Sequence, residues 1–579
     1  MKAIIAGLCA IPILLYGVLV LDSAVYCYVT DQLDMLTWPY LQWWIVVTTS
    51  TVKWWRLACT GIGIALPVLI LVAVSAPVRL CLNGGRQLRR PFFGGLRPIK
   101  DGVTDNYGHA RWATKQELSE AFGGEGCLIG AASRDASPQF LFDNLGSGPL
   151  HSLIFSGPGS FKTTTAVTRI WKWKGPRVVF DPSCEIGPIM TEALERSGCD
   201  VRTIGINNDG MNPLDWIDVS DHEADAHIRS MVDLIYDENA TKLASGGQSK
   251  DPFWSQWGRS LITCLLAHML FENQQNYPAT LATLRQGIST PEDVMQTSIL
   301  PAIHSSSSSS MAREIAGGLM GIRAPQTFSG IYSNAFAATD WLSVRSYARM
   351  VSGNSMSTSD ILRGNTVVFI QTPLRSLLAT PAIGRVVLGS FMNAMYHADG
   401  RGIDDRILFE IDEAWTLGKL NEIKLGYTTA RKYGGLIQTL WQSEGQMEGV
   451  WGPDDAKMLR DSASWRAYGA VQDGNIAEKL SKDIGERSVM AYSEGSSSGT
   501  QANQFAFIGS RSRGSNVNIH EIKRRLIKAD EITRADPDEL FVLARGFPYP
   551  IRCFAAPYFR YPSINAAMGC SRFVRDAAE

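Results

Sequence analysis

The sequence predicts an α/β fold with a parallel sheet flanked by helices, an inserted all-α domain, and two transmembrane helices ahead of both. After residue 100, apolar runs of strand length alternate with helical patterns, and each run ends in a polar or Gly/Pro segment. From about residue 216 to 349 the alternation stops, and apolar residues recur at helical spacing instead. Near the start, two long runs carry no charged residue. Four of the expected strands are Leu153–Phe155, Val178–Phe180, Thr366–Gln371 and Ile407–Ile411.

Length and composition set broad limits on function. The 579 residues suffice for roughly two to four domains of about 100–200 residues each. With 55 basic and 56 acidic residues, no overall positive charge marks the chain as a nucleic-acid binder, so nucleic acid would have to meet a local patch. The ten cysteines form no C-x-x-C pair and the eight histidines no H-E-x-x-H, so the sequence indicates neither a disulfide framework nor a zinc site.

The two uncharged runs predict membrane-spanning helices. Ala3–Leu21 has 19 residues and Leu57–Val78 has 22, each close to the roughly 20 needed to cross a bilayer. A cleaved signal peptide is the competing interpretation of the first run, but the apolar region of a signal peptide is shorter, at about 7–15 residues. Basic residues without acids follow the second run and place the rest of the chain in the cytoplasm. They are Arg79, Arg86, Arg89, Arg90, Arg97 and Lys100.

The helical insert has a start signal and a low-complexity segment. Ser220 and Glu223 have the spacing of a capping box ahead of a helix. Six consecutive serines, Ser305–Ser310, have the composition of a solvated loop. Beyond the insert, Ser493–Ser515 is rich in serine and glycine and is expected to be a surface loop, with a loop that touches substrate as the alternative. A second insert helix is indicated by Trp254, Trp257, Leu261, Leu265 and Met269.

The segment LIFSGPGSFKTTTA, which starts at Leu153, resembles a phosphate-binding loop. In such a loop, backbone N–H groups wrap the β-phosphate, a lysine reaches the β and γ oxygens, and the next hydroxyl binds magnesium. Ser156 and Phe161 stand where the pattern requires glycine. If position 161 needs a positive φ, phenylalanine costs about 1–3 kcal/mol there, and a turn that only resembles the loop is the alternative. The expected phosphate-binding residues are Gly157, Pro158, Gly159, Ser160, Phe161, Lys162, Thr163 and Thr164.

A second segment, RILFEIDEAW, places two acids directly after the expected strand Ile407–Ile411. Hydrolysis of a nucleotide needs an acid that holds the metal ion and a carboxylate that orients water. We expect Asp412 to bind magnesium together with Thr163, and Glu413 to position or activate water. The alternative, in which both acids only cap a following helix, explains the charges but not the strand before them. Together the two segments predict a core that hydrolyses a nucleotide.

A longer stretch extends this pattern: FEIDEAWTLGKLNEIKLGYTTARKYGGLIQTLWQSEGQMEGVWG. It is similar to the coupling ATPases of type IV secretion and bacterial conjugation, in which an acidic strand is followed by a Leu-Gly element, an A-R-x-x-G segment, a Gln-Ser pair and an aromatic-Gly. Further matches follow the family's order: FDPSCEI, MNPLDWI, DPFWSQWGRSLITCLL, EKLSKDIGERSV and APYFRYPS. The resemblance implies a RecA-like P-loop NTPase core that binds ATP and Mg²⁺ and is anchored as a multi-pass protein in the bacterial inner membrane.

The resemblance also implies roles for two further residues, beside those of the loop and the acids. Arg431, in the A-R-x-x-G segment, would be an arginine finger donated across a subunit boundary, since a guanidinium can stabilise charge on a transferring phosphoryl group. Gln442 would sense the γ-phosphate at a strand end. The competing interpretations are a surface or interface salt-bridge partner for Arg431 and a core amide for Gln442.

By the same resemblance the chain divides into four parts. They are an N-terminal membrane anchor with two transmembrane helices and a short periplasmic segment (1–82), the first part of the nucleotide-binding domain (83–215), the all-α insert (216–349) and the second part of the nucleotide-binding domain (350–579).

The implied function is ATP-driven transfer of relaxase-bound single-stranded DNA to the type IV secretion channel during conjugation. A homohexamer in contact with inner-membrane components of the secretion system would perform it. Two alternatives are a coupling ATPase for protein effectors only and a membrane scaffold that does not hydrolyse nucleotide. Local basic residues would meet DNA phosphates or form a solvated face: Arg511, Arg513, Lys523, Arg524 and Arg525.

Overall fold

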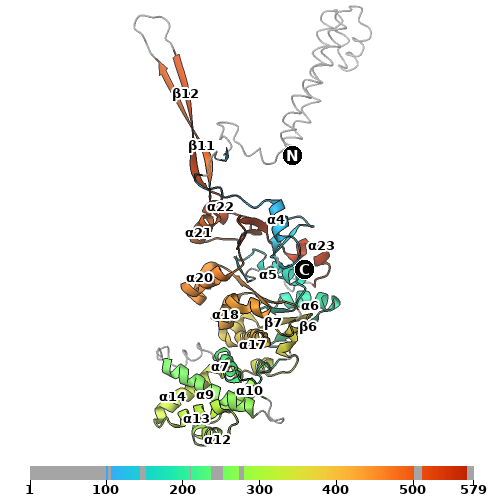
Figure 1. Ribbon diagram of the computed structural model, residues 1–579, viewed down its shortest axis with the longest axis vertical. Coiled ribbons are helices and arrows are strands. Elements are labelled where there is room, and N and C mark those ends of the chain that lie inside the picture. Colours follow the sequence, from blue (N-terminus) through green and yellow to red (C-terminus); the bar gives the residue numbers. More distant parts are fainter. Residues whose placement is uncertain are drawn as a thin grey trace, which may run out of the picture. The chain divides into compact units, whose positions relative to one another are not determined.

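The computed structural model (Figure 1) describes most of the chain after residue 100. The described residues are 100–101, 106–143, 151–208, 210–236, 252–272, 279–403, 405–500 and 511–569, with the backbone alone at 100–101, 492–500 and 511–519. The expected membrane spans, Ala3–Leu21 and Leu57–Val78, lie outside these residues. Among the helices that the structure describes, none combines the length and the apolar character that a bilayer crossing requires.

An eleven-stranded sheet forms the centre of the described residues, in the order β3-β2-β14-β13-β10-β4-β9-β8-β5-β7-β6. Its strands are β2 (Cys127–Ala131), β3 (Phe140–Asp143), β4 (Ser152–Ser156), β5 (Arg177–Phe180), β6 (Asp200–Gly205), β7 (Thr366–Gln371), β8 (Ile407–Ile411), β9 (Gly435–Trp441), β10 (Trp465–Gly469), β13 (Glu539–Ala544) and β14 (Ile551–Phe554). The four strands expected from the sequence are all present, and two of them have the expected limits.

The sheet is mixed, which corrects the expectation of a parallel sheet. The strands from β10 to β6 pair in parallel. The strands β13, β14, β2 and β3 pair antiparallel to one another, and β13 pairs antiparallel to β10. The short connection between β13 and β14 makes these two strands antiparallel, because a parallel crossover needs a dozen or more residues.

The parallel register brings strand ends that are distant in sequence to one edge. β9 lies between β4 and β8, with Phe155 opposite Trp441 and Ile411 opposite Thr439. All residues of these three strands are buried, as expected for a sheet covered on both faces. The segments that follow β4, β8 and β9 therefore meet at the carboxyl edge of the sheet, where ligands bind in such folds.

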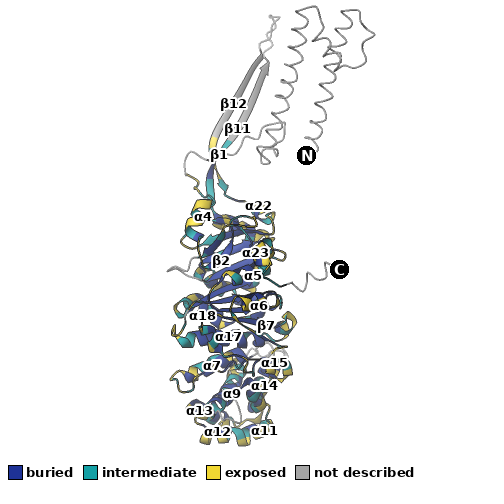
Figure 2. Cartoon of the chain, turned by 90° about the vertical axis from the view of Figure 1, so that its right-hand side faces the viewer, coloured by how far each residue is buried: buried dark blue, intermediate teal, exposed yellow. Residues whose placement is uncertain are grey.

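Two hydrophobic cores cover the opposite faces of the sheet. Leu153 and Phe155 pack into one core, and Ile154 between them packs into the other. The helices α5 (Lys162–Lys172) and α6 (Ile186–Arg196) bury their apolar residues in the core of Ile154, whereas α17 (Ala382–Ala398) belongs to the other core. Figure 2 shows the buried strands between these helices. Other helices outside the insert are α4 (Lys115–Phe122), α16 (Leu374–Ala379), η5 (Ala414–Leu417), α18 (Asn421–Thr429), η6 (Ala430–Tyr433), α19 (Glu444–Trp451), α20 (Pro453–Ser462), α21 (Gly474–Ile484), α22 (Ala529–Thr533), η7 (Tyr558–Arg560) and α23 (Pro562–Asn565).

The regular elements described between β6 and β7 are helices, joined by turns and irregular segments. Its helices are α7 (Ala224–Ile235), α9 (Pro252–Phe271), α10 (Leu281–Ile288), α11 (Glu292–Val294), η2 (Met295–Ile299), α12 (Leu300–Ser306), α13 (Ser310–Met320), α14 (Pro325–Ala338), η3 (Asp340–Ser343), α15 (Arg345–Met350) and η4 (Thr358–Leu362). The residues expected at helical spacing after Pro252 lie in α9. The domain limits at 216 and 349 stay a prediction.

Two local expectations within the insert are wrong. Ser220 caps no helix: it bonds to Asp218 Oδ1 in the preceding turn, and α7 begins only at Ala224 without a side-chain cap. The serine run is not a solvated loop throughout, because Ser307 and Ser309 are buried between α12 and α13. Ser309 Oγ accepts the Ala312 N–H at 3.1 Å as the N-cap of α13, so small hydroxyls serve the helix ends here.

The serine- and glycine-rich segment Ser493–Ser515 is also not simply a surface loop. Its described residues belong to β11 (Glu486–Thr500) and β12 (Arg511–Arg525), which form a sheet with β1 (Lys100–Asp101) in the order β1-β11-β12. Glycine is depleted in strands on average, but strand propensity depends strongly on context. Backbone hydrogen bonds between neighbouring strands form regardless of side chain, which explains why composition misled here.

Candidate nucleotide-binding site

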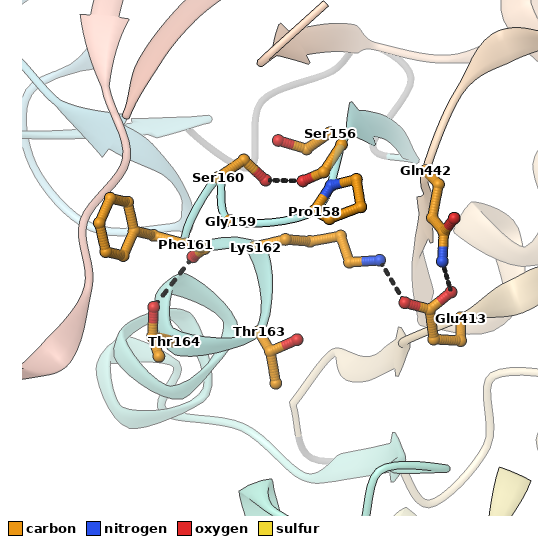
Figure 3. Close-up of a pocket in the computed structure, with 11 residues that line it drawn as sticks. Ser156, Pro158, Gly159, Ser160, Phe161, Lys162, Thr163, Thr164, Glu413 and Gln442 are labelled. Carbon is orange, nitrogen blue, oxygen red and sulfur yellow. Dashed lines mark hydrogen bonds and ion pairs between the residues drawn. The ribbon is translucent and has the colours of Figure 1, made fainter. Parts of the chain in front are cut away.

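The loop after β4 turns sharply before α5 begins at Lys162. Gly159 has a φ of 76° and Phe161 a φ of 62°, so position 161 has the left-handed conformation that the glycine of the pattern would adopt without strain. The Phe161 ring points away from the loop (Figure 3) and lies against Phe559, with 5.9 Å between ring centroids. The unusual residue therefore leaves the space in front of the loop clear.

Ser156 fits in place of glycine because its neighbour is small. The Ser156 hydroxyl is buried, and a Cβ on Gly469 of the adjacent strand β10 would lie 2.7 Å from it. Gly157 is itself confined, since a Cβ there would lie 3.0 Å from the Ala470 carbonyl oxygen. The Ser160 hydroxyl donates to the Gly157 carbonyl at 2.5 Å and closes the turn. Gly469 was not identified from the sequence, because no local motif marks it.

The backbone of this loop presents free donors. The N–H groups of Gly159, Ser160, Phe161 and Lys162 have no acceptor among the described residues. The backbone hydrogen bonds of α5 begin with the Thr165 N–H, which donates to the Phe161 carbonyl at 2.8 Å. Donors at a helix N-terminus, aligned with the positive end of the helix dipole, form an anion-binding site. The loop therefore offers the free donors that an anion such as phosphate would need.

The acids after β8 face this loop. Glu413 Oε1 lies 2.7 Å from Lys162 Nζ, and Asp412 Oδ1 lies 3.6 Å from the same nitrogen. Thr163 Oγ1 donates to Asp412 Oδ2 at 3.1 Å. Glu413 makes no side-chain cap for the following η5, and Asp412, whose Oδ1 accepts the Glu413 N–H at 3.0 Å, also bonds to Thr163, so the interpretation of the acids as helix caps only is wrong. The phosphate-binding loop and the acids after β8, both expected from the sequence, are therefore in direct contact.

Two further side chains hold Glu413. Its Oε2 accepts from Trp415 Nε1 at 2.7 Å and from Gln442 Nε2 at 3.3 Å. Gln442 is exposed at the end of β9, so the interpretation of this residue as a core amide is wrong. Trp415 was not identified as a site residue, although it stands two positions after Glu413 in the sequence.

Asp412 is buried in an acidic environment. Burial raises the pKa of its carboxyl group, the Lys162 ammonium lowers it, and the nearby Glu413 and Asp181 carboxylates raise it further. Asp181 follows β5 and accepts the N–H of Gly187 at 3.1 Å. A buried carboxylate of this kind needs a compensating cation. Asp181 was missed as a site residue, although it follows a strand in the quoted segment FDPSCEI.

These groups surround one cavity of about 340 Å³. Figure 3 shows Lys162 and Gln442 directed towards Glu413 across it. All eight residues expected to bind phosphate line the cavity, together with Ser156, Glu413 and Gln442. Asp412 is not one of the lining residues, but its carboxylate accepts a hydrogen bond from Thr163, which is.

Arg431 lies at the other end of the strand. It belongs to η6, which precedes β9, whereas Gln442 follows the last residue of β9. Seven strand residues at about 3.3 Å each separate the two ends by about 20 Å. The Arg431 carbonyl accepts from Arg406 at 3.2 Å, and no carboxylate of the described residues lies within 4.0 Å of its guanidinium. Arg431 cannot reach the cavity of its own chain.

The basic residues expected to meet DNA divide into two groups. The side chains of Arg511 and Arg513 lie outside those described. The other three have acidic partners: Lys523 lies 2.5 Å from Glu486, Arg525 lies 2.5 Å from Glu478, and Arg524 has Glu531 at 3.7 Å. Contact with DNA would have to compete with these ion pairs.

A lysine and a hydroxyl at the start of the helix after a central strand, opposite acids on a second strand, define a P-loop nucleotide-binding protein. The chain belongs to the type IV secretory system conjugative DNA transfer family, whose sequence profile matches residues 111–578.

Two relatives support this membership. The conjugal transfer protein TraG of Agrobacterium fabrum is 33% identical over 444 residues, which cover 76% of this chain and 65% of TraG, so the match spans just under two thirds of that protein. The type IV secretion system-coupling protein VirD4 of Bartonella quintana is 33% identical over 545 residues, which cover 88% of this chain and 81% of VirD4.

A solved structure shares the fold. The plasmid coupling protein TrwB, in complex with ADP and Mg²⁺, has a TM-score of 0.55 to this chain at 14% identity, over 81% of this chain and 97% of that one. A second TrwB structure, in complex with sulphate, has a TM-score of 0.56. The likeness confirms the expected RecA-like α/β core.

Proposed function

We propose that the chain is a coupling ATPase that uses ATP hydrolysis to deliver relaxase-bound single-stranded DNA to the type IV secretion channel during conjugation. The observation that carries this proposal is the meeting of Lys162 and Thr163 with Asp412 and Glu413 at one cavity, in a member of the conjugative DNA transfer family. The TrwB structure that contains ADP and Mg²⁺ supports the choice of ligands.

ATP and Mg²⁺ fit the groups that line the cavity. The free N–H groups from Gly159 to Lys162 would hold the phosphates, and Thr163 and Asp412 would hold the metal ion. Bound Mg²⁺ would neutralise charge on the transferring phosphoryl group. The Mg²⁺ ion would also balance the negative charge of the buried Asp412 and its acidic neighbours. The side chains of the site do not supply enough positive charge to do this by themselves.

The partners of Glu413 suggest how it would act. Lys162 occupies Oε1, whereas Trp415 and Gln442 occupy Oε2. If Lys162 turns to the phosphates, Oε1 is free to accept a proton from water, while Trp415 and Gln442 still orient the carboxylate. Through its hydrogen bond to the Glu413 carboxylate, Gln442 would then sense that nucleotide is bound. Arg431 would act on the site of a neighbouring subunit, as an arginine finger does.

Phosphate release by the purified protein tests the hydrolytic proposal. Lys162→Ala should lose nucleotide binding and turnover together. Glu413→Gln should keep nucleotide binding but lose turnover by about 10²-fold or more, because it removes the group that takes the proton. The matched controls are the exposed Lys174→Ala and Glu192→Gln, which should behave as the wild type. Equal and negligible rates in the wild type and both site variants would contradict hydrolysis.

We also propose a membrane location and an oligomeric state for the protein. The runs Ala3–Leu21 and Leu57–Val78 would anchor the chain in the bacterial inner membrane, with the ATPase part in the cytoplasm. A homohexamer that contacts inner-membrane components of the secretion system would bring Arg431 of one subunit to the nucleotide of the next. The distance between Arg431 and the cavity of its own chain supports a ring of this kind.

Two alternatives are separated by experiment. The strained Phe161 favours a scaffold with a degenerate loop, which the phosphate-release assay tests. The ion pairs of Lys523 and Arg525 favour a coupling ATPase for protein effectors only. Filter binding of the detergent-solubilised protein to single-stranded DNA over a salt series should show an affinity that falls as salt rises. Absence of any salt-sensitive affinity would favour effectors.

A further inference from the structure

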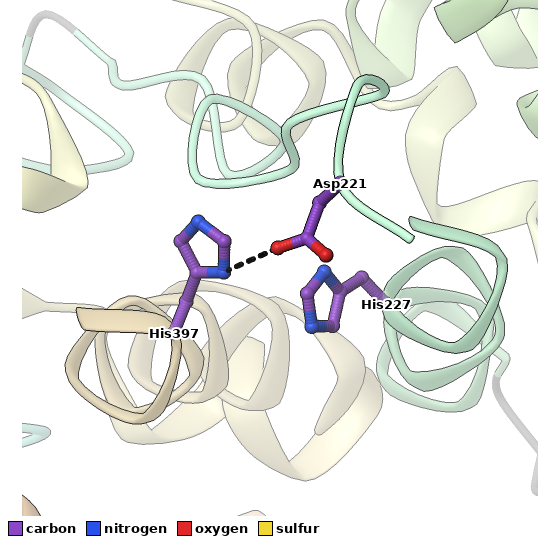
Figure 4. Close-up of side chains that lie close together, drawn as sticks. All are labelled: Asp221, His227 and His397. Carbon is purple, nitrogen blue, oxygen red and sulfur yellow. Dashed lines mark ion pairs between the residues drawn. The ribbon is translucent and has the colours of Figure 1, made fainter. Parts of the chain in front are cut away.

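A cluster of two histidines and one aspartate lies away from the nucleotide cavity, where the insert meets the core. His227 belongs to α7 and His397 to the last turn of α17, and Asp221 precedes α7 (Figure 4). One ligand atom from each residue lies within 4.8 Å of the others. Figure 4 shows a ring nitrogen of each imidazole directed towards the Asp221 carboxylate.

The three groups do not satisfy one another. His227 Nδ1 is buried and has no hydrogen-bond partner among the described residues. His397 Nδ1 and Asp221 Oδ2 are 3.7 Å apart, too far for a hydrogen bond. The two imidazoles meet edge to face, with 5.1 Å between ring centroids. Leaving buried polar atoms without partners costs free energy, so a bound cation would complete this cluster.

The residues around the cluster orient its side chains. Asp221 Oδ1 accepts the Glu223 N–H at 2.9 Å and lies 3.0 Å from His222, which leaves Oδ2 directed at the histidines. The Trp216 ring packs beside His227 as an apolar wall.

We propose that Asp221, His227 and His397 bind one divalent transition-metal ion, with Zn²⁺ as the best fit, and that this ion ties α7 and the turn before it to the end of α17. Two imidazoles and one carboxylate form a zinc ligand set that leaves a fourth position for water. Ligands at about 2.0 Å from tetrahedral zinc lie about 3.3 Å apart. The three side chains are 16–31% exposed and can rotate by the small amount required.

Zinc binding to the full-length protein tests the proposal. The protein, purified without a histidine tag and stripped by a chelator, is dialysed against Zn²⁺ without nucleotide, and bound metal is quantified. The wild type should bind one equivalent, and His227→Ala and His397→Ala should bind at least about tenfold more weakly. Millimolar Mg²⁺ should not compete, since imidazole ligands suit zinc and not magnesium. The matched control is His109→Ala, whose exposed histidine lies outside the cluster.

A second measurement separates binding from folding. Zn²⁺ should raise the thermal midpoint of the wild type but not that of Asp221→Asn, which keeps the size of the side chain. Variants that bind zinc with the stoichiometry and affinity of the wild type would overturn the proposal, as would a wild type that binds none. Neither result depends on ATP hydrolysis, so the test is independent of the proposed function.

Discussion

Phe161 has a strained backbone conformation in the phosphate loop. Its φ of 62° costs a side chain with a Cβ about 1–2 kcal/mol relative to glycine. The ring recovers part of this cost through its contact with Phe559. Backbone N–H groups, not this side chain, face the cavity, so the residue affects phosphate binding through the turn alone.

Two substitutions of Phe161 separate these effects. Phe161→Ala removes the ring but keeps the Cβ, whereas Phe161→Gly removes both. We expect the glycine variant to be about 1–2 kcal/mol more stable than the alanine variant, the reverse of their usual order, because only glycine adopts this φ without strain. Urea unfolding of both variants measures the difference. An alanine variant at least as stable as the glycine variant would show that the loop is not strained.

A buried ion pair joins the two elements that build the nucleotide site. Arg169 of α5 lies 2.6 Å from Glu410 of β8, and both side chains are almost fully buried. Burial raises the pKa of Glu410 to about 7, and Arg169 opposes this rise. This ion pair thus joins α5, which begins at Lys162, to β8, which precedes Asp412. No single sequence motif contains both Arg169 and Glu410.

Removal of Arg169 should destabilise the fold in a pH-dependent manner. Arg169→Met leaves Glu410 buried without a partner, which costs about 3–5 kcal/mol when the carboxyl group is ionised. Because the pKa of Glu410 is raised in the folded state and rises further without Arg169, the loss is small near pH 5 and grows as the pH increases through 7. Urea unfolding at pH 5.5 and pH 8 measures it.

The exposed Arg196→Met is the control for Arg169→Met, since its side chain is 59% exposed and its loss should matter little at either pH. A cost that is equal at pH 5.5 and pH 8 would contradict the assignment of the pH dependence to Glu410.

At the scale of the whole molecule, the proposed arginine finger lies away from the cavity of its own chain. The cavity contains the groups for phosphate and metal, whereas Arg431 lies beyond the opposite end of β9. A site completed between neighbouring chains, as in the proposed homohexamer, would couple hydrolysis to assembly.

Arg431→Ala should lose turnover while it still binds nucleotide. A mixture with Lys162→Ala chains provides the sharper result, because a cavity from one variant can meet an intact Arg431 from the other. We expect each variant alone to be inactive and the mixture to regain part of the phosphate release. Normal turnover by Arg431→Ala alone would refute the assignment, and a mixture without recovery would place the two residues in the same site.

The elements of the site could be predicted from local sequence. An apolar strand followed by small residues and Lys162, and a second strand followed by Asp412 and Glu413, are short-range patterns that record burial and chemistry directly. The positive φ at position 161 also follows from comparison with the glycine of the pattern. Local composition failed at Ser493–Ser515 and at the serine run, because hydrogen bonding to neighbouring segments decided the structure there.

By itself, the sequence determined the strands, the loop and the acids of this protein, since each depends on residues adjacent in the chain. Only the tertiary structure decided the position of β9 between β4 and β8, the room that Gly469 leaves for Ser156, and the meeting of His227 with His397. These features depend on which distant segments pack together, and packing is set by the free energy of the whole core rather than by any single segment.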